Sequence, residues 1–328
     1  MSRSKVLLGV AISAAFVAYL AWSVDLSQLA AELGRTRWGW ALVATILAPA
    51  GVWARARRWR YFFPPRSEPP GLVPAMMIGY MANNVLPLRA GELVRVYVVA
   101  RRWGHGFWTA LATVIVERVL DGLAVVLILS VLVFLIPVPR VFEWAAAVLL
   151  AADLGALGTL TTLALWPAPS RRLVEWMLRR WPPLQRRALR ILETFAQGLE
   201  GIRTQAHLVP LLLWTVLIWI LPALSAWAGL RAANLALPWV AGWTVLAFVS
   251  LGVSVPSAPG YVGVFHAAAA WALAIFDVSR SAAVGFAILF HATQVVPVTL
   301  IGWVFLLREH MSLGDAARAR PAPGESAP

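Results

Sequence analysis

A run of charged residues follows a break between two short apolar stretches, and these residue types could bind an ionic group. Pro87 and Gly91 interrupt the backbone, and Arg89, Glu92 and Arg95 recur at every third position. On a helix this spacing places the three charges on one face, where Glu92 can pair with either arginine. Ionisable groups at membrane depth are costly, so they usually face a protein interior and serve function. We predict a polar cavity here; the alternative is a surface loop whose arginines only set the orientation.

A second charged group comprises Glu117, Arg118 and Asp121. Glu117 and Asp121 are four residues apart and Arg118 precedes Asp121 by three, so a helix carries all three within about 100° of one face. The spacing predicts either another part of the cavity or an internal set of ion pairs with a structural role. Asp153 stands alone in a later apolar run, where we expect it to face a neighbouring hydroxyl or the cavity.

A second break interrupts an apolar stretch in the last third of the chain. Its backbone-breaking residues are Pro256, Pro259, Gly260 and Gly263. A helix is expected to restart at about residue 261, and the free amide groups at its start would suit a phosphate. His266 lies in this half-helix, where we expect it to hydrogen-bond to another helix; the alternative is a proton relay.

Several classes of enzyme leave short motifs that this sequence lacks. It has no phosphate-binding loop, no dinucleotide-binding glycine fingerprint, no His-Glu-x-x-His and no Gly-x-Ser-x-Gly. It also has no cysteine, which excludes disulfides, thiolate metal ligands and a cysteine nucleophile. We therefore predict no catalytic residue, no metal site and no cofactor, and we do not expect an enzyme.

The elements that must position these residues are membrane-spanning helices. Hydrophobic residues make up 60% of the 328 and charged residues 13%, and the mean hydropathy is +0.74. The apolar residues form runs of about 20, which match a hydrocarbon core of roughly 30 Å. No alternation of apolar and polar residues typical of β-barrel strands occurs. We predict an all-α, polytopic helical membrane bundle.

We expect six to eight crossings of the membrane. Six apolar runs are long enough to span it: 6–24, 38–53, 108–136, 144–166, 208–230 and 283–307. The first resembles a signal peptide but is too long for one, so we interpret it as a span. Residues 72–102 are predicted to form a re-entrant hairpin, since neither half can span alone. Residues 239–276 are predicted to form either a second hairpin or two full spans.

The charge distribution predicts the orientation. The formal net charge is +13, but the arginines are confined to loops that flank the apolar runs. This is the positive-inside pattern, so nucleic-acid binding is not expected. The basic segments 55–66, 89–102 and 171–203 lie on one side if both termini are cytoplasmic. We predict a multi-pass protein of the inner (plasma) membrane.

The segment 170–206 combines apolar residues at helical spacing with many arginines. We predict an amphipathic helix on the cytoplasmic surface, in contact with anionic lipid headgroups. Residues 1–312 are predicted to form one transmembrane domain that includes this segment. Residues 313–328, rich in Ala, Pro and Gly, are predicted to form a disordered tail.

Two interrupted segments lie in different halves of the chain and are expected to enter from opposite sides. Such a pair is the sequence signal of a transporter site at the interface of two repeats. Direct similarity between the halves is weak, so an inverted repeat is a hypothesis here.

The three clusters together resemble the signatures of a known family. The pattern is Asn84-x-Leu86-Pro87-x-Arg89-x-Gly91-Glu92-x-x-Arg95, then Glu117-Arg118-x-x-Asp121, then Pro256-x-x-Pro259-Gly260-x-x-Gly263. It is similar to the lysylphosphatidylglycerol synthase transmembrane-domain family, also called flippase-like membrane proteins, over roughly residues 5–310. Each motif alone is weak, and it is their order and spacing that carry the resemblance.

The resemblance implies a helical domain that moves an amphiphilic lipid, such as an aminoacylated phospholipid, across the bilayer. Carried over by position, the polar cavity residues are Arg89, Glu92, Arg95, Arg118 and Asp121, to which we add Asn84, Glu117 and His266 as candidates. Two features depart from the family. The soluble aminoacyl-transferring domain of the synthases is missing, so lipid aminoacylation is not expected, and His266 stands where relatives often carry a carboxylate.

We therefore hypothesise a lipid translocase that moves a phospholipid, modified lipid or isoprenoid-type amphiphile across the inner membrane. Its arginines would pair with the headgroup phosphate. Two alternatives stay open. One is a membrane-embedded transferase that takes a glycosyl or phosphoryl group from a lipid carrier, with Glu92, Glu117 or Asp121 as base or metal ligand. The other is a non-catalytic assembly subunit of a lipid or glycan pathway.

Overall fold

The computed structural model describes residues 26–63, 69–86, 90–103, 106–137, 140–165, 167–198, 204–255 and 257–310. Every regular element in these ranges is a helix, which confirms the predicted all-α fold. Several predictions lie outside the described residues, namely the first span at 6–24, the tail at 313–328, and the residues Pro87, Arg89 and Pro256.

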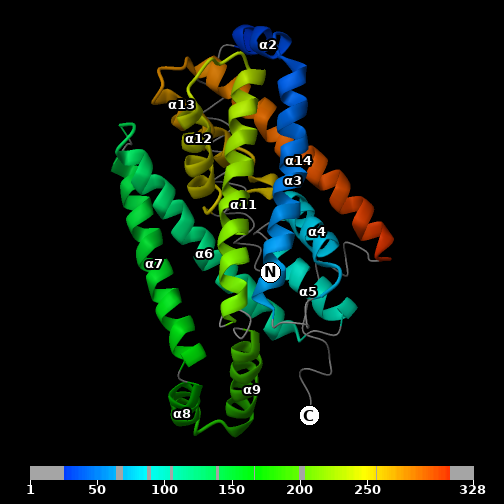
Figure 1. The fold of residues 1–328 in the computed structure, drawn as a ribbon, viewed down its shortest axis with the longest axis vertical. Helices are drawn as coiled ribbons and strands as arrows, with labels where there is room; N and C mark the ends of the chain where they lie inside the picture. The colour runs from blue at the N-terminus through cyan, green and yellow to red at the C-terminus, as the bar shows by residue number, and fades with distance from the viewer. Residues whose placement is uncertain are drawn as a thin grey trace.

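Long helices form the body of the bundle (Figure 1). In chain order they are α3 (Trp38–Trp59), α6 (Phe107–Val133), α7 (Arg140–Leu165), α11 (Gln205–Ala232) and α14 (Arg280–Arg308). Four segments in the described part of the chain are long and apolar enough to cross a membrane, in α3, α7, α11 and α14. The predicted membrane bundle is confirmed in its architecture.

The helices α3 and α11 pack antiparallel and share the most extensive contact between any two described elements. Where α3 begins and α11 ends, the Arg37 amide donates a hydrogen bond to the Ala232 carbonyl (2.8 Å). Further along, the Ser225 hydroxyl donates to the Ala44 carbonyl (3.0 Å). This pair connects the two halves of the chain.

One predicted boundary near the start of the chain is wrong. The span predicted at 38–53 continues as helix to Trp59 and then into the 3-10 turn η1 (Arg60–Phe62). Arg58 and Trp59 are fully buried, whereas Arg57 is exposed, so this basic stretch is a packed helix and not the surface loop that its arginines suggested. A short helix, α2 (Leu26–Gly34), lies between the predicted spans 6–24 and 38–53.

Within its described residues, the amphipathic helix predicted at 170–206 is divided into two helices, α8 (Pro167–Met177) and α9 (Pro182–Gly198). The chain turns at 178–181 because a proline lacks the amide hydrogen that would continue the first helix, whereas it fits well at the start of the next. Both helices lie together at one end of the bundle (Figure 1).

The first predicted break separates α4 (Leu72–Val85) from α5 (Gly91–Trp103), which pack against each other as a hairpin. With 14 and 13 residues, each helix is only about 20 Å long, too short to cross a bilayer. A Cβ on Gly91 would lie 1.9 Å from the Gly79 carbonyl oxygen, so only glycine permits this approach. The Gly91 amide donates to Asn83 Oδ1 (2.7 Å).

The second predicted break separates α12 (Trp239–Gly252) from α13 (Val264–Ala274), with the 3-10 turn η3 (Pro259–Tyr261) between them. Gly260 and Gly263 have φ angles of +67° and +85°, which glycine adopts at little cost. The helix therefore restarts after Gly263 and not at the predicted residue 261.

The two broken segments meet inside the bundle. A Cβ on Gly260 would lie 3.4 Å from the Asn84 carbonyl oxygen, and η3 contacts α4. The order of long helix, broken pair and long helix occurs twice, as α3, α4–α5, α6 and as α11, α12–α13, α14. One pair lies toward the end that carries α8 and α9, and the other toward the opposite end (Figure 1). The fold thus has the inverted arrangement that the sequence only suggested.

The helix α7 lies at the edge of the bundle. In the apolar segment of α7 that could cross a membrane, only 11% of the residues are buried, against 28% or more in the corresponding segments of α3, α11 and α14. Its main partner is α6, and the two approach closely at a glycine. A Cβ on Gly122 of α6 would lie 2.1 Å from Asp153 Oδ2 of α7.

A glycine also sets the crossing of α14 over α4, and it provides a test of the packing. A Cβ on Gly302 would lie 2.3 Å from Met81 Cβ and 2.7 Å from the Met77 carbonyl oxygen, whereas one on Gly158 of α7 would meet nothing within 4 Å. We expect Gly302→Ala to lower the unfolding midpoint of the detergent-solubilised protein, because overpacking costs about 1–3 kcal/mol. The matched change Gly158→Ala should leave the midpoint unchanged or raise it, since alanine favours a helix. Equal midpoints for both variants would contradict this crossing.

Candidate functional site

A cavity of about 480 Å³ lies where the two broken segments meet. Its wall includes residues of α3, α4, α5, α6, α7, α11, α12 and η3. The charged lining residues are Arg55, Glu92, Arg95, Arg118, Asp121 and Asp153, and the neutral polar ones are Tyr80, Asn83, Ser250, Ser254 and Tyr261. Irregular backbone at membrane depth is tolerated where it lines such a space.

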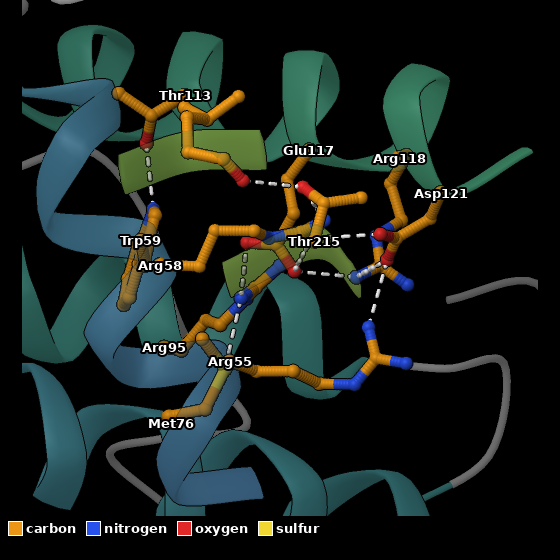
Figure 2. A network of polar contacts seen from close by, with 11 residues as sticks. Arg55, Arg58, Trp59, Met76, Arg95, Thr113, Glu117, Arg118, Asp121 and Thr215 are labelled. Atoms are coloured by element: carbon orange, nitrogen blue, oxygen red, sulfur yellow. Dashed lines mark hydrogen bonds and ion pairs between the residues drawn. The ribbon is translucent and has the colours of Figure 1, made fainter. Parts of the chain in front are cut away.

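Three arginines hold Asp121 at the edge of this cavity (Figure 2). Arg55 Nη1 lies 2.9 Å from Asp121 Oδ2, and Arg58 Nη2 lies 2.7 Å from Oδ1. Arg118, one turn before Asp121 on α6, places its Nη2 2.9 Å from Oδ2. Both carboxylate oxygens are therefore bound by charged donors, which are stronger than neutral ones.

Glu117 forms the second centre of the same network and is fully buried. Arg95 Nη1 of α5 donates to Glu117 Oε2 (2.9 Å), and Arg118 Nη2 donates to Oε1. Arg58 Nη2 lies 3.8 Å from Oε1. The two carboxylates thus join α3, α5 and α6 through one set of ion pairs.

Helical spacing produces this arrangement on both sides. Arg55 and Arg58 are three residues apart on α3, and Glu117 and Asp121 are four apart on α6, so each pair projects from one face of its helix. Where the two faces meet, two acids oppose two bases. Arg58 Nη1 also reaches Thr215 Oγ1 of α11 (3.5 Å).

An aromatic and sulfur shell covers the buried side of the network. The Trp59 indole donates to Thr113 Oγ1 (2.9 Å), and the Arg95 guanidinium stacks over the Trp59 ring at 4.8 Å. Arg95 Nη1 also contacts Met76 Sδ (3.0 Å). Cation–π contacts of this kind stabilise a guanidinium that is removed from water.

The network carries more positive than negative charge. Four guanidinium groups share two carboxylates, so each arginine has an acidic partner but the network as a whole keeps a formal charge of +2. Burial differs within it: the Arg58 and Glu117 side chains are fully buried, whereas the Arg118 side chain is 34% exposed. Arg55, Arg95 and Arg118 line the cavity, so they are the arginines that an anion in the cavity would meet.

Five of the candidates from the sequence come together here. Glu92, Arg95, Arg118 and Asp121 line the cavity, and Glu117 lies behind them. Arg95 forms its ion pair with Glu117 rather than with Glu92, which helical spacing had suggested. Only the packing of α5 against α6 creates that pair.

Two candidates lie away from the cavity lining. Asn84 Nδ2 donates to Thr299 Oγ1 of α14 (2.8 Å). The Gly263 amide donates to His266 Nδ1 (3.3 Å), so His266 caps its own helix instead of bonding to another. One amide at the helix start expected to seat a phosphate is therefore bound by His266, and no residue of α13 lines the cavity.

Arg55 and Arg58 belong to the site although the sequence did not identify them as members. Both were assigned to a basic loop, since arginines next to an apolar run usually obey the positive-inside rule. A signal was nevertheless present, because they are three residues apart and lie on one helical face if the span continues beyond residue 53. The packing that closes this face against Glu117 and Asp121 is a tertiary feature.

Comparison with known proteins gives one match. Residues 6–302 match the protein family described as lysylphosphatidylglycerol synthase TM region. No curated protein and no solved structure matches the chain. The matched range contains the whole first repeat and most of the second, with all of the charged network.

The network predicts a large effect of neutralising its most buried acid. We expect Glu117→Gln to lower the free energy of unfolding by about 3–5 kcal/mol, because it leaves buried guanidinium groups without their partner. Denaturant unfolding in mixed micelles measures this. The control is Glu193→Gln, which removes an ion pair to Arg171 between side chains that are both 57% exposed and should change little. A Glu117 variant as stable as the control would contradict the structural importance of the network.

Proposed function

We propose that this chain, which belongs to the lysylphosphatidylglycerol synthase TM region family, is a translocase that carries the phosphate-bearing headgroup of a membrane lipid through its cavity. The observation that carries the proposal is the set of four arginines that share two carboxylates along one side of the cavity. A guanidinium binds phosphate oxygens through two parallel hydrogen bonds. A headgroup phosphate would supply the negative charge that two carboxylates cannot.

The size of the cavity supports a headgroup rather than a whole lipid. At about 480 Å³ it falls within the usual range for small-molecule sites, about 300–1,000 Å³. Long acyl chains would exceed this space, so they would stay in the surrounding bilayer while the headgroup moves. No nucleotide site is required by such a step.

The inverted arrangement supports transport rather than binding alone. Broken helices that enter from opposite ends and meet at a central site allow one repeat to move against the other and expose the site to either side. Here the breaks meet at Gly260 and Asn84, next to the cavity. The headgroup would pass from one face to the other by this exchange.

We further infer that the end with α8 and α9 faces the cytoplasm. Both helices lie at this end (Figure 1), and the exposed arginines on and between them are Arg171, Arg172, Arg179, Arg180, Arg186, Arg187 and Arg190. Basic segments stay on the cytoplasmic side and attract anionic headgroups. The inner membrane is the setting that this orientation implies.

The test is leaflet exchange of a fluorescent phospholipid in liposomes that contain the purified protein. We expect Arg118→Gln to slow exchange by about tenfold or more, because a hydrogen bond to a charged group is worth about 1.5–3 kcal/mol. Arg118→Lys keeps the charge but loses the planar guanidinium, so its exchange rate should lie between those of the wild type and Arg118→Gln. Arg186→Gln on α9 is the control and should exchange as the wild type does.

Three outcomes would overturn the proposal. One is wild-type exchange no faster than in empty liposomes, and another is exchange that is unaffected in Arg118→Gln. The third is a chemically modified lipid, detected by mass spectrometry of the same liposomes, which would indicate a transferase. Thermal unfolding of each variant separates loss of function from loss of fold.

A further inference from the structure

A carboxylate without a positive partner lies in the cavity wall. Asp153 is 7% exposed, and its Oδ2 has no hydrogen-bond partner among the described residues. It lies 13 residues after the first residue of α7, about 20 Å along that helix and close to its middle. The ion pairs that stabilise Glu117 and Asp121 have no counterpart here.

The position is built by the packing of α7 against α6. A Cβ on Gly122 would lie 2.1 Å from Asp153 Oδ2 and 2.7 Å from Cγ, so a glycine makes the space that the carboxyl group occupies. The carboxyl group also lines the cavity, together with Ser250 and Ser254 from the end of α12. Asp153 therefore faces the same space as Arg118.

Charged groups on the packed elements do not neutralise it. On α6, Arg118 is bound to Glu117 and Asp121, and α12 carries no charged residue. The remaining charges on the cavity wall are Arg55, Glu92 and Arg95, and those on α7 and the following α8 are Arg140, Glu143, Arg171, Arg172 and Glu175. None of them forms an ion pair with Asp153 within the described structure.

A buried carboxylate at membrane depth is stabilised by a positive charge, because the lone anion is costly in a low-dielectric environment. A metal ion needs several ligands, and the described residues contain no group of three or more His, Cys, Asp and Glu that could hold one. A proton needs only the carboxylate itself and water in the cavity to deliver it.

We propose that Asp153 is a proton-binding site on the cavity wall, and that its protonation accompanies headgroup movement; this second part rests on the proposed function. A proton from cavity water adds to a carboxylate oxygen of Asp153, which forms the neutral carboxylic acid, and the reverse step returns the proton to water. No other bond changes and no co-reactant is needed.

The edge position of α7 gives this proton a mechanical effect. Since α7 packs chiefly against α6 and is otherwise little buried, few other contacts oppose a movement of α7 when the charge of Asp153 changes. The neutral acid can pack against Gly122, whereas the anion is drawn toward water and the guanidinium groups of the cavity. Protonation therefore favours closure of α7 on α6, and deprotonation favours an open cavity.

A direct measurement of the proton tests the first part. Infrared difference spectra of the purified protein between buffers of about pH 6 and about pH 9, a range in which exposed carboxyl groups stay ionised, should contain the carbonyl band of a protonated carboxyl group. The band should be lost in Asp153→Asn and kept in Glu143→Gln, an exposed acid on the same helix. A band that survives in Asp153→Asn would overturn the proton site, whether or not the protein moves lipid.

Leaflet exchange in the same liposomes tests the second part. Wild type and Glu143→Gln should show a rate that changes with pH, and Asp153→Asn, which mimics the neutral acid, should show a flat profile. An unchanged pH profile in Asp153→Asn would overturn the coupling. A second result would also overturn the coupling: the wild-type rate does not change with pH, and Asp153→Asn loses only the discrimination between headgroups with and without an amine. In that case Asp153 would bind the lipid amine and not a proton. Absence of exchange by the wild type, with the band present, would refute the proposed function but leave the proton site.

Discussion

The pairing of buried charge at Glu117 and Asp121 is the constraint on which the rest of the site depends. In a bundle surrounded by lipid, a buried ion without a partner is costly, so Glu117 and Asp121 must keep their arginines. Because those arginines come from α3, α5 and α6, the pairing fixes three elements of the first repeat at once. The position of the broken hairpin follows from it, since Arg95 ties α5 to α6.

Glycine contacts set how closely the helix backbones approach one another, whereas the ion pairs hold the side chains between them. The hairpin closes at Gly79 and Gly91, and α6 meets α7 at Gly122. At these points a single methyl group would separate the elements, so the small residue sets the distance. The ion pairs then act across gaps that the glycines define. A cavity with charged walls can exist inside the membrane because both conditions hold together.

Sequence reasoning found the breaks and most of the charges, but it found few of the partners. Proline and glycine interrupt a helix by local chemistry, so the hairpins could be predicted from positions such as Gly91 and Gly260. Partners depend on which helices touch. Arg58 was assigned to a surface loop because its neighbours are basic, yet its side chain is fully buried against the two acids of α6. His266 had been named as a cavity candidate, but its ring accepts a hydrogen bond from the Gly263 amide at the start of its own helix.

The charges around the cavity are distributed unequally between the repeats. The first repeat supplies Arg55, Glu92, Arg95, Arg118 and Asp121, whereas the second supplies only neutral groups, such as Trp219, Ser250 and Tyr261. An anion in the cavity would therefore be held by the first repeat and would slide against the second. In an alternating motion the headgroup would travel with the arginines, past a wall that offers no competing charge. The remaining charge, Asp153, belongs to neither repeat but to α7, which follows the first. A helix outside both repeats can respond to their motion without breaking the ion pairs that hold the first repeat together.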